Sequence, residues 1–454
     1  MSIFERVRGW FSPAVPVAPG VYHYRSKPES PERYRMHLRV EADGTGILIV
    51  NASTVLHLNQ TAVEHAKLVM DDVGPEEAGR IVARRYRVAR EQAEADARRL
   101  RDTLARLVST EDLCPITYLD VSRVDPFQTP TSAPYRVDLA LTYRCDNFCG
   151  HCYVERPRET SELSTGDWRR AMDALWAAGV PHLCFTGGEA TLRDDLEELV
   201  TYAEDVGFVT GLLTNGRRLA DRAYLDSLVA AGLDHVQITL ESHDEAVHNA
   251  MVCADAWRET VQGVRNAVDA DLYALTNTTL TRANVRDIER TVDFVAQLGV
   301  RAFACNGLIY TGQAKEYGLA VPESELAEVL VRVADAAERN GLRFIWYTPT
   351  QYCELNPIEL ELGIKSCTAA KYNLCVEPNG DVIPCQSYYE SMGNILRDPW
   401  PSIWNHPVAR RLRDKEYLAA KCRDCEQLPL CGGGCPLYPQ RQPYICVDSK
   451  SNPA

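Results

Sequence analysis

Alternating apolar and polar positions predict a small module of strands followed by helices at the start of the chain. From about Arg35 to Val108, the segments "MHLRV", "GILIV" and "TVLHL" have the pattern of short β-strands. Three helices are expected after them, one opening at Asn59, one opening at Pro75, and a long one from about Arg90 to Val108. Asparagine is a favourable helix N-cap, and proline suits the first helical turn.

A longer region, from Tyr135 to about Asn340, alternates apolar strand candidates with amphipathic helices. The six strand candidates are "YRVDLAL", "HLCFT", "VTGLLT", "HVQITL", "ALTNTTL" and "AFACNGL". This alternation predicts parallel βα units of the α/β class, closed into a partial (β/α)6 barrel like a TIM barrel. Barrels of this type carry their active sites at the C-terminal ends of the strands.

The last region, from about Tyr352, has little periodic pattern and many cysteines. The segment "CVEPNGDVIPC" predicts a hairpin with an Asn-Gly turn, whereas "CRDCEQLPLCGGGC" is interrupted by glycine and proline and should need bound metal to hold its structure. A stretch containing proline, serine and threonine, "SRVDPFQTPTSAP", predicts a linker before the barrel. We therefore expect an N-terminal extension (1–34), the small module (35–110), a linker (111–134), the barrel (135–345) and a cysteine-rich domain (346–454).

Length and charge restrict the class of protein. The 454 residues exceed the size at which one hydrophobic core stops growing, so more than one domain is expected. A formal net charge of -14 argues against a nucleic-acid partner, because binding to a phosphate backbone relies on clustered lysine and arginine. The N-terminus lacks the apolar segment of a secretory signal, and no run of about 18 apolar residues could span a membrane. The 16 cysteines then indicate the reducing cytoplasm, where such clusters more often hold metal than form disulfides.

Three cysteines, Cys145, Cys149 and Cys152, stand within eight residues directly after the first barrel strand. A closed tetrahedral site needs four ligands, which structural zinc usually takes as two close pairs, and this trio has no obvious fourth ligand nearby. Three thiolates can instead hold three irons of a cubane cluster and leave the fourth iron open to an exogenous ligand. A zinc knuckle or incidental thiols are the alternative.

The spacing C-x3-C-x-φ-C, where φ is usually aromatic and is His151 here, resembles the motif of the radical S-adenosylmethionine (SAM) superfamily. The resemblance implies that SAM chelates the open iron through its amino and carboxylate groups. Electron transfer would then break the S–C5′ bond and give methionine and a 5′-deoxyadenosyl radical. His151 would lie against the adenine, and Tyr153 would either join the SAM site or simply pack.

Two more segments stand at the ends of the next strands, as they do in this superfamily. "FTGGEATL" carries Gly187, Gly188 and Glu189, and "LLTNGRRL" carries Asn215. Two glycines let a backbone approach a ligand closely, and a carboxylate can pair with the SAM ammonium. Polar residues at the ends of the fourth to sixth strands are further candidates for cofactor contacts: Thr239, Glu241, Asn277 and Asn306.

Seven cysteines of the tail have the spacing of the SPASM domain, the extension found on radical SAM peptide maturases, and "MGNI" resembles the segment after its second cysteine. A zinc ribbon is the alternative. The resemblance implies two auxiliary [4Fe–4S] clusters. One would be held by Cys422, Cys425, Cys431 and Cys446. The other would be held by Cys367, Cys385 and Cys435, with Cys353 as candidate fourth ligand; without Cys353 it would have an open iron that could bind substrate. The remaining cysteines are expected to be buried, inert thiols: Cys114, Cys184, Cys253, Cys305 and Cys375.

The first module resembles the PqqD-like recognition element, a winged-helix-like domain that captures the leader of a ribosomally made precursor peptide. The resemblance rests on "GILIVNASTVLHLNQTA" and on the order of three strands and three helices. It implies that the leader adds a strand to an exposed sheet edge, for which "TVLHL" is the expected edge. The alternative is a small domain that only packs on the barrel.

Together these resemblances imply a radical SAM enzyme that modifies a precursor peptide, with thioether or carbon–carbon cross-linking as the leading product class. Its partners would be that peptide and a low-potential electron donor such as ferredoxin or flavodoxin. Sulfatase-maturing relatives have an aspartate base after the second SPASM cysteine, but Gln386 stands here, and its amide cannot accept that proton. Two other readings stay open at this point: a radical SAM enzyme acting on a small molecule such as a tetrapyrrole, and a non-catalytic iron–sulfur or zinc protein.

Overall fold

The computed structural model describes residues 16–27, 34–51, 54–109, 131–154, 160–270 and 272–438. The chain divides into two compact units, one of residues 1–124 with 176–181 and one of residues 125–175 with 182–454. The predicted linker, 111–134, lies outside the described residues except for its last four. Cys114 and Cys446 also lie outside them.

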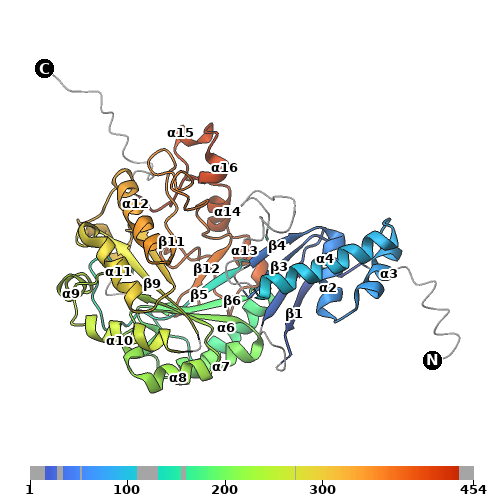
Figure 1. The fold of residues 1–454 in the computed structure, drawn as a ribbon, viewed down its shortest axis with the longest axis horizontal. Coiled ribbons are helices and arrows are strands. Elements are labelled where there is room, and N and C mark those ends of the chain that lie inside the picture. The colour runs from blue at the N-terminus through green and yellow to red at the C-terminus, as the bar shows by residue number, and fades with distance from the viewer. Residues whose placement is uncertain are drawn as a thin grey trace. The chain divides into compact units, whose positions relative to one another are not determined.

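The first unit contains a four-stranded antiparallel sheet and three helices (Figure 1). The strands, in sheet order, are β1 (Gly20–Arg25), β2 (Arg35–Val40), β3 (Gly46–Val50) and β4 (Thr54–Leu58). The helices are α2 (Gln60–Met70), α3 (Pro75–Arg85) and α4 (Arg90–Ser109). The three predicted strands and three predicted helices are thus confirmed. Strand β1 was not predicted: it lies in the expected N-terminal extension, yet it pairs with β2 along its full length.

Local chemistry explains these elements. The Asn59 side chain accepts a hydrogen bond from the Ala62 backbone N–H at 2.9 Å and so caps α2, while Pro75 opens α3. Apolar side chains of β2, β3 and α4 meet in one core that includes Leu38, Leu48 and Leu104. The sheet order leaves β1 and β4 as its two edge strands.

The second unit is built on parallel strands β5 to β11, which are hydrogen-bonded in chain order. They are β5 (Arg136–Thr142), β6 (His182–Gly187), β7 (Val209–Thr214), β8 (His235–Thr239), β9 (Tyr273–Leu280), β10 (Ala302–Gly307) and β11 (Arg343–Trp346). The intervening helices are α6 (Thr165–Ala177), α7 (Leu196–Val206), α8 (Arg222–Ala230), α9 (Glu245–Val252), α10 (Trp257–Val268), α11 (Ile288–Gln297) and α12 (Glu323–Arg339). Short 3-10 helices span Ala190–Leu192, Arg218–Ala220, Val285–Asp287 and Gly312–Glu316. The six predicted strands are confirmed, and β11 adds a seventh.

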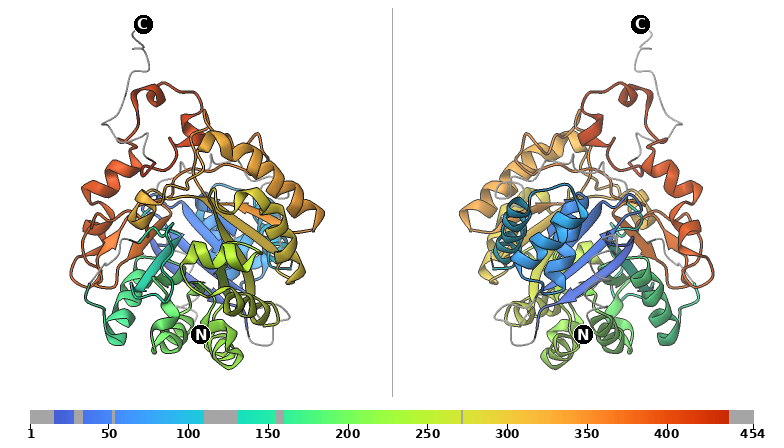
Figure 2. Two further views of the ribbon diagram at one scale, coloured as in Figure 1. Left: turned by 90° about the vertical axis from the view of Figure 1, so that its left-hand side faces the viewer. Right: turned by 90° about the vertical axis from the view of Figure 1, so that its right-hand side faces the viewer.

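The strands present an apolar outer face and a more polar inner face. Successive side chains of a strand point to opposite faces. Leu183 and Phe185 of β6 share one face of the sheet and are fully buried. The helices lie around the outside of the sheet (Figure 2). The inner face carries His182 and Cys184 of β6 and, in register with Cys184, Asp138 of β5. The C-terminal ends of all these strands lie at one edge, because the strands are parallel.

The cysteine-rich region contains β12 (Asn373–Val376), β13 (Val382–Ile383), α13 (Trp400–Trp404), α14 (Pro407–Arg413), α15 (Ala420–Arg423) and α16 (Leu428–Cys431). The predicted hairpin is confirmed, since β12 and β13 are antiparallel and Gly380 in the turn has a φ of +87°. Strand β12 also pairs in parallel with β5, so the hairpin extends the barrel sheet. No pattern in the sequence predicted this pairing.

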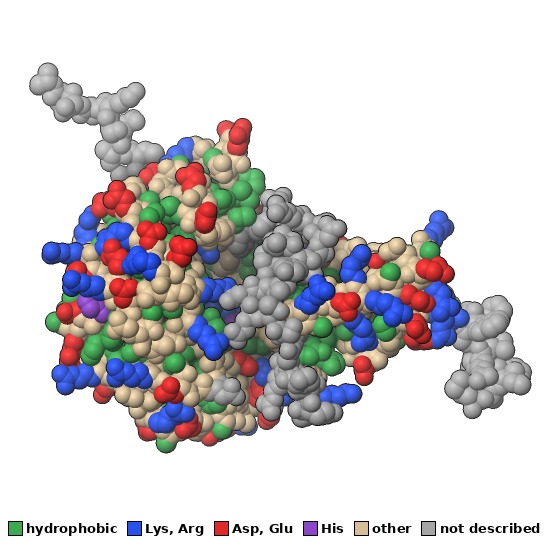
Figure 3. All heavy atoms as spheres, viewed as in Figure 1, with side chains coloured by type: hydrophobic (Ala, Val, Ile, Leu, Met, Phe, Trp, Pro, Cys, Tyr) green, Lys and Arg blue, Asp and Glu red, His purple; other side chains and the backbone are tan. Residues whose placement is uncertain are grey.

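Charged side chains of both signs are mixed over the face drawn in Figure 3. None of the described helices is both long enough and apolar enough to cross a lipid bilayer.

Candidate functional site

The three clustered cysteines lie in the loop that follows β5, at the C-terminal edge of the barrel. Cys145, Cys149 and Cys152 are all partly buried. Backbone N–H groups point at two of the sulfurs: that of Asn147 donates to Cys145 Sγ at 3.5 Å, and that of Val154 donates to Cys152 Sγ at 3.4 Å. Such donors stabilise a thiolate, which is the form that binds metal. The loop therefore favours the thiolate forms of Cys145 and Cys152, which can bind a metal.

Residues at the end of β7 hold this loop in place. The Asn215 side-chain amide donates to Asp146 Oδ1 at 2.6 Å. Arg217 donates from Nη1 to the Asp146 carbonyl at 2.8 Å and from Nε to Glu259 Oε2 at 2.5 Å. From the sequence, Asn215 was predicted to contact the cofactor, whereas Asp146 and Arg217 were not predicted. The only signal for them was the position of Arg217 in the "TNGRRL" segment.

Gly187 and Gly188 lie where no side chain would fit. Gly187 has a φ of +138°, and a Cβ atom there would come within 2.1 Å of the Thr142 carbonyl oxygen. A Cβ atom at Gly188 would come within 2.4 Å of the Arg144 carbonyl oxygen. The two glycines therefore let the end of β6 run directly against the start of the cysteine loop.

The Glu189 carboxylate is buried and already accepts four hydrogen bonds from its own chain. Oε1 accepts from the Thr191 N–H at 3.1 Å and from the hydroxyls of Thr191 and Thr214, both at 2.8 Å. Oε2 accepts from the Asn215 N–H at 2.7 Å. Burial raises the pKa of Glu189, while these hydrogen bonds oppose the shift. This geometry gives Glu189 a role in joining the ends of β6 and β7, a role that the sequence analysis did not predict.

A second buried carboxylate, Glu241, meets His151 from the cysteine loop. His151 Nε2 lies 2.8 Å from Glu241 Oε1, and the Thr279 N–H donates to Oε2 at 2.8 Å. The Glu241 N–H points to His248 Nδ1 at 3.2 Å, and burial lowers the pKa of His248 to about 4. Glu241 thus orients His151 in the position where the superfamily motif usually has an aromatic side chain.

The buried polar atoms at this edge that make no hydrogen bond among the described residues include His151 Nδ1, Asn277 Oδ1 and Glu241 Oε1, whose 2.8 Å approach to His151 Nε2 is an ion-pair contact. Asn277 also donates from Nδ2 to Asn306 Oδ1 at 2.9 Å, so both predicted asparagines lie together. Thr239 ends β8 on the same face, in register with Asn277. Three partly buried thiols lie at this edge, and the two glycines leave the strand end without side chains. Buried polar atoms without partners usually mark a place for a ligand. Together these features fit a bound iron–sulfur cluster and a polar cofactor.

Tyr153 contacts the cysteine-rich region. Its hydroxyl donates to Gln386 Oε1 at 3.1 Å, and its carbonyl accepts from the Tyr389 hydroxyl at 3.2 Å. Burial raises the pKa of Tyr153 well above its usual range. Of the two roles considered for Tyr153, these contacts favour packing. They also link the cysteine loop to Gln386, next to Cys385.

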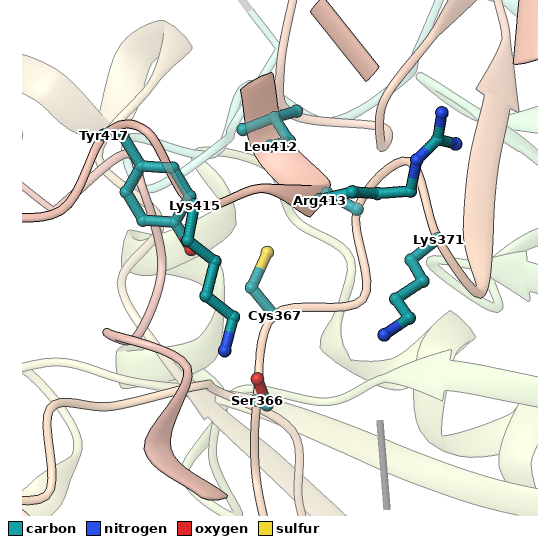
Figure 4. Close-up of a pocket in the computed structure, with 8 residues that line it drawn as sticks. Ser366, Cys367, Lys371, Leu412, Arg413, Lys415 and Tyr417 are labelled. Carbon is teal, nitrogen blue, oxygen red and sulfur yellow. The ribbon is translucent and has the colours of Figure 1, made fainter. Parts of the chain in front are cut away.

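The thiols of Cys385 and Cys435 lie close enough to interact electrostatically. Burial is the main reason that the pKa of Cys385 is raised to about 12, and Cys435 adds to the shift. Cys367 lines a pocket with Lys371, Arg413 and Lys415 (Figure 4). Burial lowers the pKa of Lys415, and the nearby Cys431 and Cys367 oppose that shift. Cationic groups beside these sulfurs would stabilise the negative charge of a thiolate-bound cluster.

Cys353 lies near Cys422, which was predicted to belong to the other auxiliary cluster. Burial raises the pKa of Cys422, and Cys353, Cys431 and Cys425 add to the shift as neighbouring thiols. The segment before Cys353 is fixed there because the Tyr352 N–H donates to Cys431 Sγ at 3.4 Å. From the sequence, Cys353 was the candidate fourth ligand beside Cys367, Cys385 and Cys435, and these contacts instead favour a place near Cys422 and Cys431.

The expectation of buried thiols holds for Cys184, Cys305 and Cys375. It is wrong for Cys253, which is exposed. Cys253 is the C-cap of α9 with a φ of +51°, so it follows the last helical residue and is not part of the buried face formed by His248, Met251 and Val252.

Family models match two segments of the chain. Residues 139–295 match the model described as the radical SAM superfamily, and residues 367–426 match the SPASM model, described as an iron–sulfur cluster-binding domain. The first segment contains the cysteine loop and the ends of β6, β7 and β8. The second contains four of the seven tail cysteines with SPASM spacing, Cys367, Cys385, Cys422 and Cys425.

Two relatives match over two thirds of the chain. The PqqA peptide cyclase of Ruegeria pomeroyi is 30% identical over 318 residues, which cover 67% of this chain and 82% of that relative. The AdoMet-dependent heme synthase of Methanosarcina barkeri is 28% identical over 324 residues, covering 67% and 91%.

Solved structures share the fold. Streptococcus suis SuiB bound to its precursor peptide SuiA superposes with a TM-score of 0.68 at 17% identity, covering 92% of this chain and 98% of SuiB. A structure of anSMEcpe with bound AdoMet and a peptide has a TM-score of 0.51 at 17% identity, covering 66% and 89%.

Proposed function

This chain belongs to the radical SAM superfamily, and we propose that it uses radical chemistry to modify a ribosomally made precursor peptide. It is an enzyme with a radical SAM barrel and a SPASM domain, and its cofactors are [4Fe–4S] clusters and SAM. When bound, these supply a 5′-deoxyadenosyl radical that takes a hydrogen atom from the substrate. Thioether or carbon–carbon cross-linking is the proposed outcome, with the electron released in bond formation passing to an acceptor such as an auxiliary cluster.

The observation that carries the proposal is the presence of the first unit. The likeness to SuiB covers 92% of the chain, a share that cannot be reached without β1 to α4, whereas the likeness to anSMEcpe covers 66%. SuiB was solved with its precursor peptide. The sequence relatives do not separate the alternatives, because the heme synthase and the PqqA peptide cyclase each match 67% of this chain. The support for a peptide substrate is the first unit, which the likeness to SuiB includes.

We propose that the first unit is a PqqD-like recognition element and that the leader pairs with β4. No strand of the described residues pairs with the outer side of β4, so one row of its backbone groups is the proposed place for strand addition. The other edge, β1, serves as an internal control. Binding of the leader should slow amide hydrogen exchange in 54–58 and leave 20–25 unchanged. Equal protection of both strands, or of neither, would contradict this assignment.

In the barrel, we propose that Cys145, Cys149 and Cys152 hold the SAM-binding cluster. Asp146, Asn215 and Arg217 fix their loop. Gly187 and Gly188 let the backbone approach the cofactor. The remaining predicted contacts, His151, Glu189, Thr239 and Glu241, shape the same edge, with His151 held by Glu241 at 2.8 Å.

In the SPASM domain, we propose two auxiliary clusters. Cys422, Cys425, Cys431 and Cys446 are assigned to one, and Cys367, Cys385 and Cys435 to the other. Full occupancy of three cubanes gives about twelve irons. Iron counts of Cys353→Ala and Cys446→Ala test which residue completes each cluster, because the Cys353 thiol is a neighbour of Cys422.

Turnover with a deuterated peptide tests the function. The reconstituted full chain receives SAM, a reductant and a synthetic, deuterated peptide encoded by a short reading frame beside the gene. Deuterium should appear in 5′-deoxyadenosine, and the peptide should lose two hydrogens in mass for each cross-link. The Cys145/Cys149/Cys152 triple alanine variant is the inactive control. SAM cleavage that never transfers deuterium from the peptide would refute the proposal. Ferredoxin and flavodoxin are the proposed electron donors and can replace the chemical reductant in the same assay.

A further inference from the structure

Three metal-ligating side chains meet on the inner face of the barrel, away from the cysteine loop. The ligand atoms of His182, Cys184 and His235 all lie within 4.8 Å of one another. His182 and Cys184 belong to β6, and His235 belongs to β8. His182 and His235 are the first residues of their strands, so this cluster lies toward the N-terminal ends of the strands, whereas the cysteine loop lies at the C-terminal ends.

Strand register explains why these residues meet. Cys184 of β6 is in register with Gly211 of β7, and Gly211 is in register with His235 of β8, so all three positions share one face of the sheet. A Cβ atom at Gly211 would lie 2.4 Å from His235 Nε2 and 2.9 Å from Cys184 Sγ. The glycine therefore leaves the space in which side chains of two non-adjacent strands come together.

The distances are close to those of a metal site. His182 Nε2 lies 2.8 Å from His235 Nε2 and 3.4 Å from Cys184 Sγ. Tetrahedral zinc with ordinary bond lengths places two nitrogen ligands about 3.3 Å apart and a nitrogen and a sulfur about 3.6 Å apart. Binding would need the two rings to separate by about half an ångström. Without metal, the same atoms can hydrogen-bond to one another.

The surroundings tolerate the added charge. A zinc ion with one thiolate and two neutral imidazoles carries a single positive charge. Its neighbour Arg136 is paired with Asp138, from Nε to Oδ1 at 2.8 Å, and Asp138 also accepts from Asn373 at 3.2 Å. Arg136 therefore does not present an uncompensated charge to the site.

We propose that His182, Cys184 and His235 bind a zinc ion that joins β6 and β8 across Gly211. Cysteine and histidine are the ligands that zinc prefers, and three protein ligands leave a fourth position for water or another small ligand. The bound zinc would be distinct from the iron–sulfur clusters in both ligand set and place. Its expected role is to tie the strands together at this end of the barrel.

The test measures zinc on the reconstituted full chain, with all clusters assembled, after incubation with one equivalent of Zn²⁺ and removal of the excess. We expect about one zinc per chain, with an X-ray absorption spectrum showing one sulfur at about 2.3 Å and two nitrogens at about 2.0–2.1 Å. Cys184→Ser and His235→Gln should each lower the zinc content at least tenfold and leave the iron content unchanged. Cys305→Ser is the matched control, because Cys305 is another buried thiol of the same parallel sheet, in β10, and lies outside this cluster.

The outcome is decisive in each case. Zinc surrounded only by sulfur, or zinc content unaffected by Cys184→Ser, would mean that the ion occupies a cluster site and would overturn the proposal. No zinc bound to the wild-type chain would overturn it as well. If the variants lose iron and thus fail to fold, the wild-type absorption spectrum still decides between one sulfur with two nitrogens and sulfur alone.

Discussion

Replacing Glu189 by glutamine separates a role in holding the barrel edge from a role in binding SAM. The carboxylate accepts four hydrogen bonds, three on Oε1 and one on Oε2. An amide can present its oxygen to the three donors, but its NH2 group then faces the Asn215 backbone N–H. A hydrogen bond to a charged acceptor contributes about 1.5–3 kcal/mol, and a buried donor left without a partner costs about 1–3 kcal/mol. The neutral amide also relieves part of the cost of burying a charge, so we expect a net loss of about 2 kcal/mol.

This loss should be visible without SAM. A change of about 2 kcal/mol lowers the Tm by roughly 3 °C in a unit as large as the one formed by residues 125–175 and 182–454. Thermal unfolding of the reconstituted full chain without SAM, alongside hydrogen exchange of 209–216, measures it. Glu198→Gln is the matched control, because Glu198 is an exposed residue of α7 whose ion pair with Arg169 should contribute less than about 1 kcal/mol. An unchanged Tm combined with weaker SAM binding would refute the structural reasoning and favour a direct contact between Glu189 and the SAM ammonium.

Three further predictions follow from particular contacts. Gly187→Ala should cost at least about 3 kcal/mol and remove SAM binding, because its Cβ would collide with the Thr142 carbonyl; isothermal titration with SAM checks it, and near-normal binding would contradict it. Tyr153→Phe should destabilise the barrel by about 1 kcal/mol through loss of the hydrogen bond to Gln386, which urea unfolding measures, and no change would show that the bond contributes little. Burial lowers the pKa of His37 to about 3, so the neutral ring is favoured in the folded first unit. The contribution of His37 to the stability of this unit should be full above pH 6.5 and fall by about 3 kcal/mol by pH 4. His37→Gln should remove that part of the loss and leave the part due to His23, whose pKa burial lowers to about 4; hydrogen exchange of 36–50, corrected for intrinsic rates, records the difference.

The first unit shows which elements a local sequence pattern can predict. The strands β2 to β4 and the caps at Asn59 and Pro75 depend on neighbouring residues, so the sequence was enough to predict them. Strand β1 was missed because none of its residues is fully buried, so its sequence has no strong apolar alternation, and its strand conformation depends on pairing with β2. The same limit hid the pairing of β12 with β5, which joins residues more than two hundred positions apart.

The sequence by itself determined the chemistry of this protein: three cysteines at a fixed spacing, glycines and a carboxylate after the next strand, and a cysteine-rich tail, because ligand spacing within a loop is a local property. Only the tertiary structure decided which neighbours each side chain has. It turned Glu189 toward Thr191, Thr214 and Asn215, brought His151 to Glu241, and exposed Cys253. It also placed Cys184 beside two histidines from separate strands. These contacts depend on strand register and on the space left by glycines such as Gly211. Neither can be predicted from a single segment, because both depend on how separate segments pair.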